Sequence, residues 1–96
     1  MGDRILVAYA GRCGSTAEVA EAIGRTIADG KTAVDVQRVQ DVTDLTRYRA
    51  VVLGSAVRVG KWLPEAMEFI KAHQSLLNRM PVAYFQVCND YDGEQQ

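Results

Sequence analysis

Apolar runs recur along the chain and predict four β-strands. Three of the runs are rich in branched and aromatic residues, and one alternates polar and apolar side chains. In chain order, the strands are predicted at residues 4–9, 33–39, 50–55 and 82–87. The alternating second strand suits a sheet edge or the place next to it. The third strand is typical of a central parallel strand that is buried on both faces.

Amphipathic stretches between these strands predict helices, because apolar residues recur there at spacings of three and four. One helix leaves the loop after the first strand and closes at residues 30–31, and another starts at Pro64 and runs to about Asn78. The residues predicted to face the core are Val19, Ala20, Ile23 and Ile27 in the first helix, and Met67, Ile70 and Leu77 in the last helix. In the polar segment at residues 41–48, the spacing of Val42, Leu45 and Tyr48 is that of a short helical turn.

Strands that alternate with helices over short loops predict an α/β fold with a parallel sheet, right-handed crossovers and helices on both faces. Ligands of such sheets bind at the carboxyl ends of the strands, where the strand order reverses. The loops after Tyr9, Ser55 and Val87 fall on that edge. We therefore expect the functional residues in these loops.

The loop that joins the first strand to the first helix has the features of a phosphate site. Gly11 and Gly14 allow close approach of the backbone, Ser15 and Thr16 offer hydroxyls, and Arg12 offers a positive charge. The first N–H groups of the helix have no partner within it, and the helix dipole is positive there. The loop has neither the Walker ending nor the dinucleotide glycine spacing, which disfavours nucleoside triphosphates. A tight turn without a ligand is the alternative.

Cys13 in the same loop lies near a helix N-terminus, where a thiolate nucleophile is favoured. A cysteine phosphatase loop would need an arginine six positions on, where Val19 stands. The small IIB subunits of sugar phosphotransferase systems, which the chain resembles in size and strand count only, end the first strand in their phosphorylated cysteine. Ala10 or Gly11 occupies that place here. We interpret Cys13 as a small loop residue rather than a nucleophile.

A second loop, at residues 54–62, is the more specific signal. Two glycines bracket small and cationic residues, and Trp62 follows. Such a loop offers backbone donors to a flat heteroaromatic ring and an aromatic side chain to lie against it. In the alternative interpretation, Trp62 only caps the next helix. The third strand ends in Gly54 and Ser55 and not in an aspartate, which excludes a receiver domain.

Composition narrows the classes of function. The chain has 96 residues, enough for one domain, with 11 basic residues scattered among 12 acidic ones and a net charge of −1. Without a basic stripe, nucleic acid is not expected as a partner. No apolar run is long enough to span a membrane and no cleavable leader is visible, so we expect a cytoplasmic protein. The two cysteines and His73 lack metal-ligand spacing, so no metal is expected.

Taken together, these motifs resemble the flavodoxin family. Within the family, they look most like the branch that contains menaquinone-dependent protoporphyrinogen dehydrogenase. The resemblance extends from residue 4 to about residue 88, and the Gly-Ser-Ala-x-Arg-x-Gly sequence of residues 54–60 is its specific part. The matching segments are residues 5–9, 14–16, 51–60, 69–73 and 78–83.

The resemblance implies a flavodoxin-like three-layer sandwich of strand order 2-1-3-4 at residues 1–88, followed by a polar tail at residues 89–96 that we expect to be frayed. The family binds FMN non-covalently, with the phosphate in the first loop and the isoalloxazine ring between the second and third loops. The implied cofactor contacts are Gly11, Arg12, Cys13, Gly14, Ser15 and Thr16 at the phosphate, and Ser55, Ala56, Val57, Arg58, Gly60 and Trp62 beside the ring.

Two departures from the family pattern qualify this expectation. Ala10 and Gly11 stand where the family usually has Ser or Thr, so weaker FMN binding is expected. The family also continues with a third flavin loop, a fifth strand and a last helix, whereas only Tyr91 remains here as a candidate for the third-loop stacking residue. An open fourth strand then predicts self-association, or a partner chain that supplies the missing half.

The function that follows from the resemblance is FMN-dependent electron transfer. A quinone-linked dehydrogenase acting on a porphyrinogen is the candidate activity, and neither the redox partner nor a catalytic acid or base is identified. The alternative is a truncated module without flavin that works through its edge strand. The missing hydroxyls at positions 10 and 11 favour this alternative, and Arg58, Gly60 and Trp62 favour the flavoprotein. The sequence fits a naturally short protein and a fragment equally well.

Overall fold

The computed structural model describes residues 3–11, 14–29, 32–58 and 60–88. Strands and helices alternate through this part of the chain, as the apolar pattern predicts. In chain order, the elements are β1 (Arg4–Ala10), α1 (Gly14–Ala28), β2 (Val34–Arg38), the 3-10 helix η1 (Val39–Asp41), β3 (Tyr48–Arg58), β4 (Lys61–Trp62), α2 (Pro64–Ala72), α3 (Gln74–Leu77) and β5 (Val82–Cys88).

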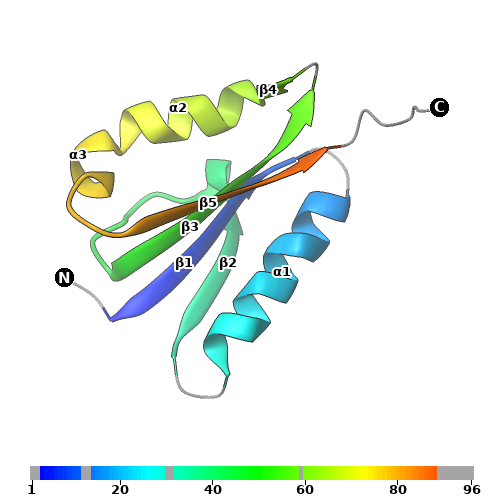
Figure 1. Ribbon diagram of the computed structural model, residues 1–96. Coiled ribbons are helices and arrows are strands. Elements are labelled where there is room, and N and C mark those ends of the chain that lie inside the picture. Colours follow the sequence, from blue (N-terminus) through cyan, green and yellow to red (C-terminus); the bar gives the residue numbers. More distant parts are fainter. Residues whose placement is uncertain (1–2, 12–13, 30–31, 59, 89–96) are drawn as a thin grey trace.

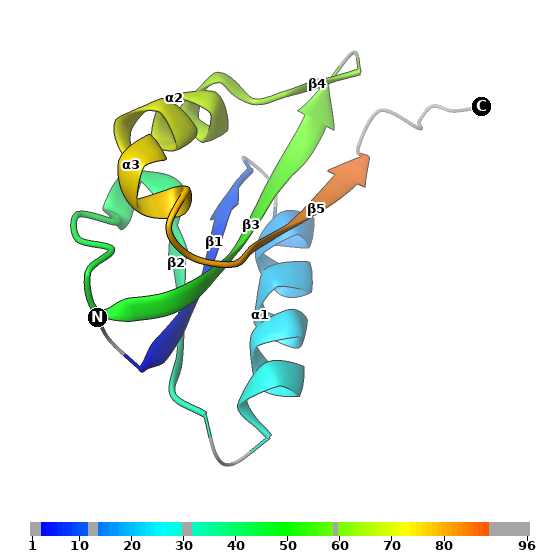
Figure 2. The ribbon, with the colours of Figure 1, turned by 60° about the vertical axis from the view of Figure 1, so that its left-hand side comes forward.

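The strands form one sheet of five strands between two layers of helices. Parallel pairing gives the order β2-β1-β3-β5, which confirms the predicted order because β5 is the fourth of the expected strands. The short β4 was not expected and pairs antiparallel with the end of β3. Helix α1 covers one face of the sheet, and α2 and α3 lie on the opposite face (Figures 1 and 2). The predicted three-layer α/β sandwich is therefore correct.

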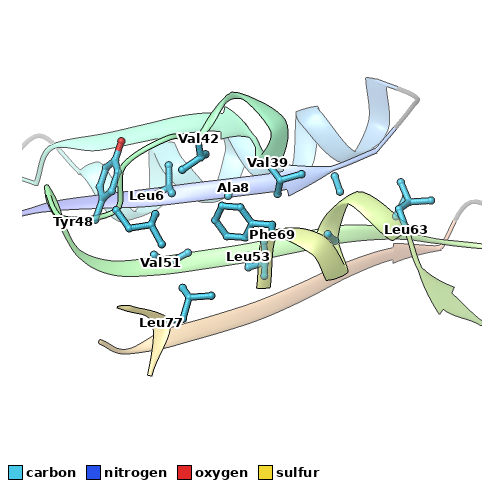
Figure 3. Close-up of a cluster of buried hydrophobic side chains, with 14 residues drawn as sticks. Leu6, Ala8, Val39, Val42, Tyr48, Val51, Leu53, Leu63, Phe69 and Leu77 are labelled. Carbon is cyan, nitrogen blue, oxygen red and sulfur yellow. The ribbon is translucent and has the colours of Figure 1, made fainter. Parts of the chain in front are cut away.

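The main core lies between the sheet and the layer formed by α2 and η1 (Figure 3). Leu6 and Ala8 of β1 meet Val51 and Leu53 of β3 there, because alternate residues of neighbouring strands share a face. Phe69 covers them from α2. The expectation of a central third strand is confirmed, since residues 53–57 of β3 are all buried.

Two predictions about helices are wrong. Val42, Leu45 and Tyr48 are buried, but residues 42–45 are not helical, and the short helix η1 precedes them. The last helix is broken at His73, whose backbone leaves the helical region (φ −115°, ψ 20°) while its ring lies 4.7 Å from that of Phe69. The side chains of Val42, Leu45 and Tyr48 are buried in the core cluster without a helical backbone, so their spacing does not require a helix.

Two predicted core residues and the loop predicted at residues 54–62 also differ from expectation. Met67 is 48% exposed and Val19 is 37% exposed, since α2 buries Ala66 and Phe69 instead, and α1 buries Ala20. The loop is mostly extended, since β3 continues to Arg58 and β4 follows. Pairing explains the extension, because β5 accompanies β3 as far as Val57.

An ion pair joins the first three strands near the amino ends of β1 and β3. The guanidinium of Arg4 donates to both carboxylate oxygens of Asp35, at 2.6 and 3.2 Å, and the Tyr48 hydroxyl donates to Asp35 Oδ2 at 2.7 Å. The hydrogen bonds from Arg4 hold the pKa of Asp35 below its usual value, with a smaller contribution from Tyr48. Burial, followed by the bond to Asp35, raises the pKa of Tyr48 to about 12.

Tyr48→Phe is expected to lower the free energy of unfolding by about 1 kcal/mol at neutral pH, because one buried hydrogen bond is lost. Since the pKa of Tyr48 is raised on folding, its contribution is complete below the unfolded pKa of about 10. It is lost as the pH rises through about 12. Urea unfolding at several pH values measures the difference between the two proteins, with Tyr9→Phe as the control. A difference that stays constant up to pH 12 would contradict this assignment.

Candidate functional site

The carboxyl ends of β1, β3 and β5 meet at one edge of the sheet. Ser55 of β3 lies opposite Ala10 of β1 on one side and Gln86 of β5 on the other. The first residue after β1 and the turn that leaves β3 therefore lie on the same edge, as the sequence predicts. This edge is the candidate functional site.

The first loop places Gly11 against the start of α1. A Cβ atom at Gly11 would lie 2.6 Å from Thr16 Oγ1 and 2.7 Å from Thr16 Cβ, so only glycine fits there. Gly14 is the first residue of α1, and apart from its chain neighbours and the helix backbone, no atom of the described residues lies within 4 Å of the position that a Cβ would take. Arg12 and Cys13, both predicted site residues, lie outside the described residues.

Thr16 carries the clearest sign of a ligand in this loop. Its side chain is fully buried, and Oγ1 has no hydrogen-bond partner in the described part of the chain. Leaving a buried hydroxyl unpaired is costly, so native structures rarely do it without a reason. The first turn of α1 contains no acidic residue to repel an anion. Helix start, glycine contact and unpaired hydroxyl together fit a phosphate group.

Ser55 of the second segment is turned into the protein. Its hydroxyl accepts a hydrogen bond from the Leu63 N–H at 3.1 Å and donates to the Ala56 carbonyl at 2.8 Å. Ala56 and Val57 are buried as well. These predicted site residues are thus brought to the edge, but the Ser55 hydroxyl is engaged in internal bonds. The side chain of Arg58 lies outside the described part of the structure.

The turn between β3 and β4 lies beyond these residues. Gly60 has φ 75°, in the left-handed region that favours glycine. Apart from its chain neighbours, no atom in the described part of the structure lies within 4 Å of where its Cβ would be. The next strand places Lys61 opposite Arg58, and Trp62 opposite Val57. An exposed backbone turn with free space beside it therefore stands at the edge where a planar ring would lie.

Two residues of β5 join this region without having been predicted as part of it. The Trp62 indole N–H donates to Gln86 Oε1 at 3.3 Å, and the ring of Trp62 meets that of Tyr84 edge-on at 5.9 Å. Their alternation along the predicted fourth strand was the available signal, since it places both on one face. Only the pairing of β5 with β3 shows which face of the sheet these two residues share and that Trp62 is their partner. The predicted stacking candidate Tyr91 lies outside the described residues.

In the parts of the chain that the structure describes, no helix is both long and apolar enough to cross a membrane.

Comparison with known proteins gives a consistent result. The model of a family described as "Flavodoxin domain" matches residues 6–96. The chain is 29% identical over 86 residues to protoporphyrinogen IX dehydrogenase (quinone) of Escherichia coli strain K12, covering 88% of this chain and 48% of the relative. It is 32% identical over 87 residues to the protein of the same name from Leishmania major, covering 88% and 38%. The chain thus spans about half the length of these curated relatives or less.

Among solved structures, flavodoxin of Fusobacterium nucleatum bound to flavin mononucleotide superposes with a TM-score of 0.73. It is 17% identical, and the match covers 93% of this chain and 53% of the flavodoxin. At that identity, the likeness shows the fold alone.

Proposed function

The chain belongs to the flavodoxin family, and from this premise we propose that it binds FMN non-covalently and transfers electrons through the flavin. When bound, FMN supplies the redox chemistry by accepting and returning electrons at its isoalloxazine ring. The protein contributes binding, orientation and the surroundings of the ring. The observation that carries the proposal is the unpaired, buried hydroxyl of Thr16 beside Gly11 at the start of α1.

The phosphate end is assigned to the first loop. Thr16 Oγ1 would donate to the phosphate, Gly11 leaves room for the Thr16 side chain, and the position of a Cβ at Gly14 is open. The first turn of α1 adds the positive end of the helix dipole, and Ser15 stays a predicted contact. Arg12 and Cys13 complete the loop and stay predicted phosphate contacts. The weaker FMN binding expected from Ala10 and Gly11 also stays a prediction.

The ring end is assigned to the segment from Ser55 to Trp62. The buried residues Ala56 and Val57 exclude water from one side of the site, and the turn at Gly60 presents its backbone to the ring. Ser55 supports the segment through its bond to Leu63 and stays a predicted ring contact. Arg58 and Trp62 stay predicted ring neighbours. The assigned domain comprises residues 1–88, with residues 89–96 as a tail.

We further propose that the activity is that of a quinone-linked oxidoreductase acting on a porphyrinogen. The support is the likeness to protoporphyrinogen IX dehydrogenase (quinone) over most of this chain. The substrate assignment has less support than FMN binding, because the match covers only 48% and 38% of the length of those relatives. The cytoplasmic location stays a prediction.

The direct test of FMN binding is the visible absorbance spectrum of the purified chain after incubation with FMN and desalting. We expect a retained two-band flavin spectrum. Equilibrium dialysis should also show a lower Kd for FMN than for riboflavin, which lacks the phosphate. A chain that retains neither flavin would refute the proposal, and equal affinity for the two would refute the phosphate site.

The edge of β5 supports a second proposal, self-association. β5 pairs with β3 along one edge, and no described strand pairs with its other edge. Tyr84 on this strand is 59% exposed. Unpaired strand edges with apolar side chains favour association with another chain. We propose a second copy as the partner, and this is the form in which the module would act if it bound no flavin.

Light scattering during size exclusion, at tens of micromolar protein, is expected to show a mass above that of one chain. Replacing the exposed Tyr84 by Lys should shift the mass toward the monomer, because a charge on an edge strand opposes pairing. A monodisperse monomer of the unmodified chain at that concentration would contradict self-association.

A further inference from the structure

Side chains of β4 and β5 contact each other beside the candidate ring site. Trp62 of β4 donates its indole N–H to Gln86 Oε1 at 3.3 Å. The Trp62 and Tyr84 rings are 5.9 Å apart between centroids, with an angle of 62° between their planes. Tyr84 and Gln86 alternate along β5 and so share a face of the sheet. We refer to Trp62, Tyr84 and Gln86 as the β4–β5 clasp.

The clasp adds to a short strand pairing. Only two pairs of residues join β4 to β3, Val57 with Trp62 and Arg58 with Lys61. So short a hairpin is marginal by itself. The Ser55 hydroxyl anchors the end of the segment inside the protein by accepting from the Leu63 N–H. On the outside, the clasp ties Trp62 to β5, so the turn at Gly60 is fixed from two directions.

The indole of Trp62 is directed toward β5 by these contacts. It is partly buried, packs against the main core cluster and meets both clasp residues of β5. These contacts hold Trp62 beside the turn at Gly60.

We propose that Gln86 and Tyr84 are positioning residues for the flavin ring and act through Trp62 by fixing the turn at Gly60. This inference rests on the proposed FMN binding. Both residues lie on the face of β5 that Trp62 covers, whereas the ring is assigned to the carboxyl edge of the sheet. Their replacement should therefore weaken binding of the ring without affecting the phosphate end.

The test uses Gln86→Leu, which removes the acceptor oxygen while keeping a side chain of similar size, and Gln86→Glu, which keeps an acceptor. Trp62 is the only tryptophan of the sequence, so its fluorescence reports the clasp in the flavin-free protein. We expect stronger acrylamide quenching of Trp62 in Gln86→Leu. The Kd values for FMN and for riboflavin should both rise about fivefold, because one hydrogen bond that holds the site is lost.

Gln86→Glu should restore wild-type values in both measurements, and Tyr84→Ala should act like Gln86→Leu. Gln74→Leu, at an exposed position of α3, is the matched control and should change neither. Unchanged flavin affinities in Gln86→Leu, or a change for FMN alone, would overturn the inference. Failure of the wild-type chain to bind either flavin would instead refute the proposed function, and the positioning role with it.

Discussion

Gly54→Ala is expected to lower the free energy of unfolding by about 2 to 3 kcal/mol. A Cβ atom at position 54 would lie 2.0, 2.2 and 2.3 Å from three carbons of the Phe85 ring, far inside van der Waals contact. Either β3 moves or the ring leaves its place across the strand pair, and both lose packing. In a strand without such a neighbour, the same change to alanine would stabilise the folded protein, because it lowers the conformational entropy of the unfolded chain. The sign of the effect is therefore informative.

Urea unfolding measures this change, and two further variants isolate its cause. Gly14→Ala is the matched control, because nothing lies within 4 Å of the added atom, and its effect should be small. Adding Phe85→Leu to Gly54→Ala should recover part of the loss, since the ring carbons that collide are then absent. If Gly54→Ala remained within 0.5 kcal/mol of the wild type, well below the range expected for overpacking, the close packing against Phe85 would be disproved.

Thr16→Val is expected to raise the Kd for FMN by about ten- to a hundredfold while leaving the Kd for riboflavin nearly unchanged. A hydrogen bond to a charged group contributes about 1.5 to 3 kcal/mol, and only FMN carries the phosphate. The same change should leave the stability of the flavin-free chain equal or higher, because the removed hydroxyl has no partner in the described structure. If Thr16 served only the fold, Thr16→Val would not weaken FMN binding while leaving the stability of the flavin-free chain unchanged or higher.

Thr26→Val is the control for this experiment. Thr26 lies on the exposed side of the same helix, and its hydroxyl donates to the Ala22 carbonyl at 3.0 Å. The change is chemically identical but distant from the start of α1, so both flavin affinities should stay at wild-type values. A loss of stability in Thr16→Val, with no change in FMN affinity, would assign the hydroxyl to the fold and remove the main support for the phosphate site.

The sequence by itself determined the class and order of the fold. Alternation of apolar runs and amphipathic stretches is a local property, and it was sufficient to place β1, β2, the core of β3 and β5, together with α1. The parallel order followed from the short connections and from the family resemblance. The glycines and hydroxyls after β1 also marked the candidate phosphate loop, because their chemistry is visible residue by residue.

Tertiary structure decided what depends on contacts between distant segments. β3 extends past Ser55 because β5 pairs with it, His73 interrupts the last helix, and Met67 faces outward. None of these is a property of a local pattern. The same reason explains the site: that Thr16 lacks a partner, that Ser55 bonds inward and that Gln86 holds Trp62 are consequences of register and packing. Sequence spacing names the groups that are available, and only the packed sheet determines which of them are left for a ligand.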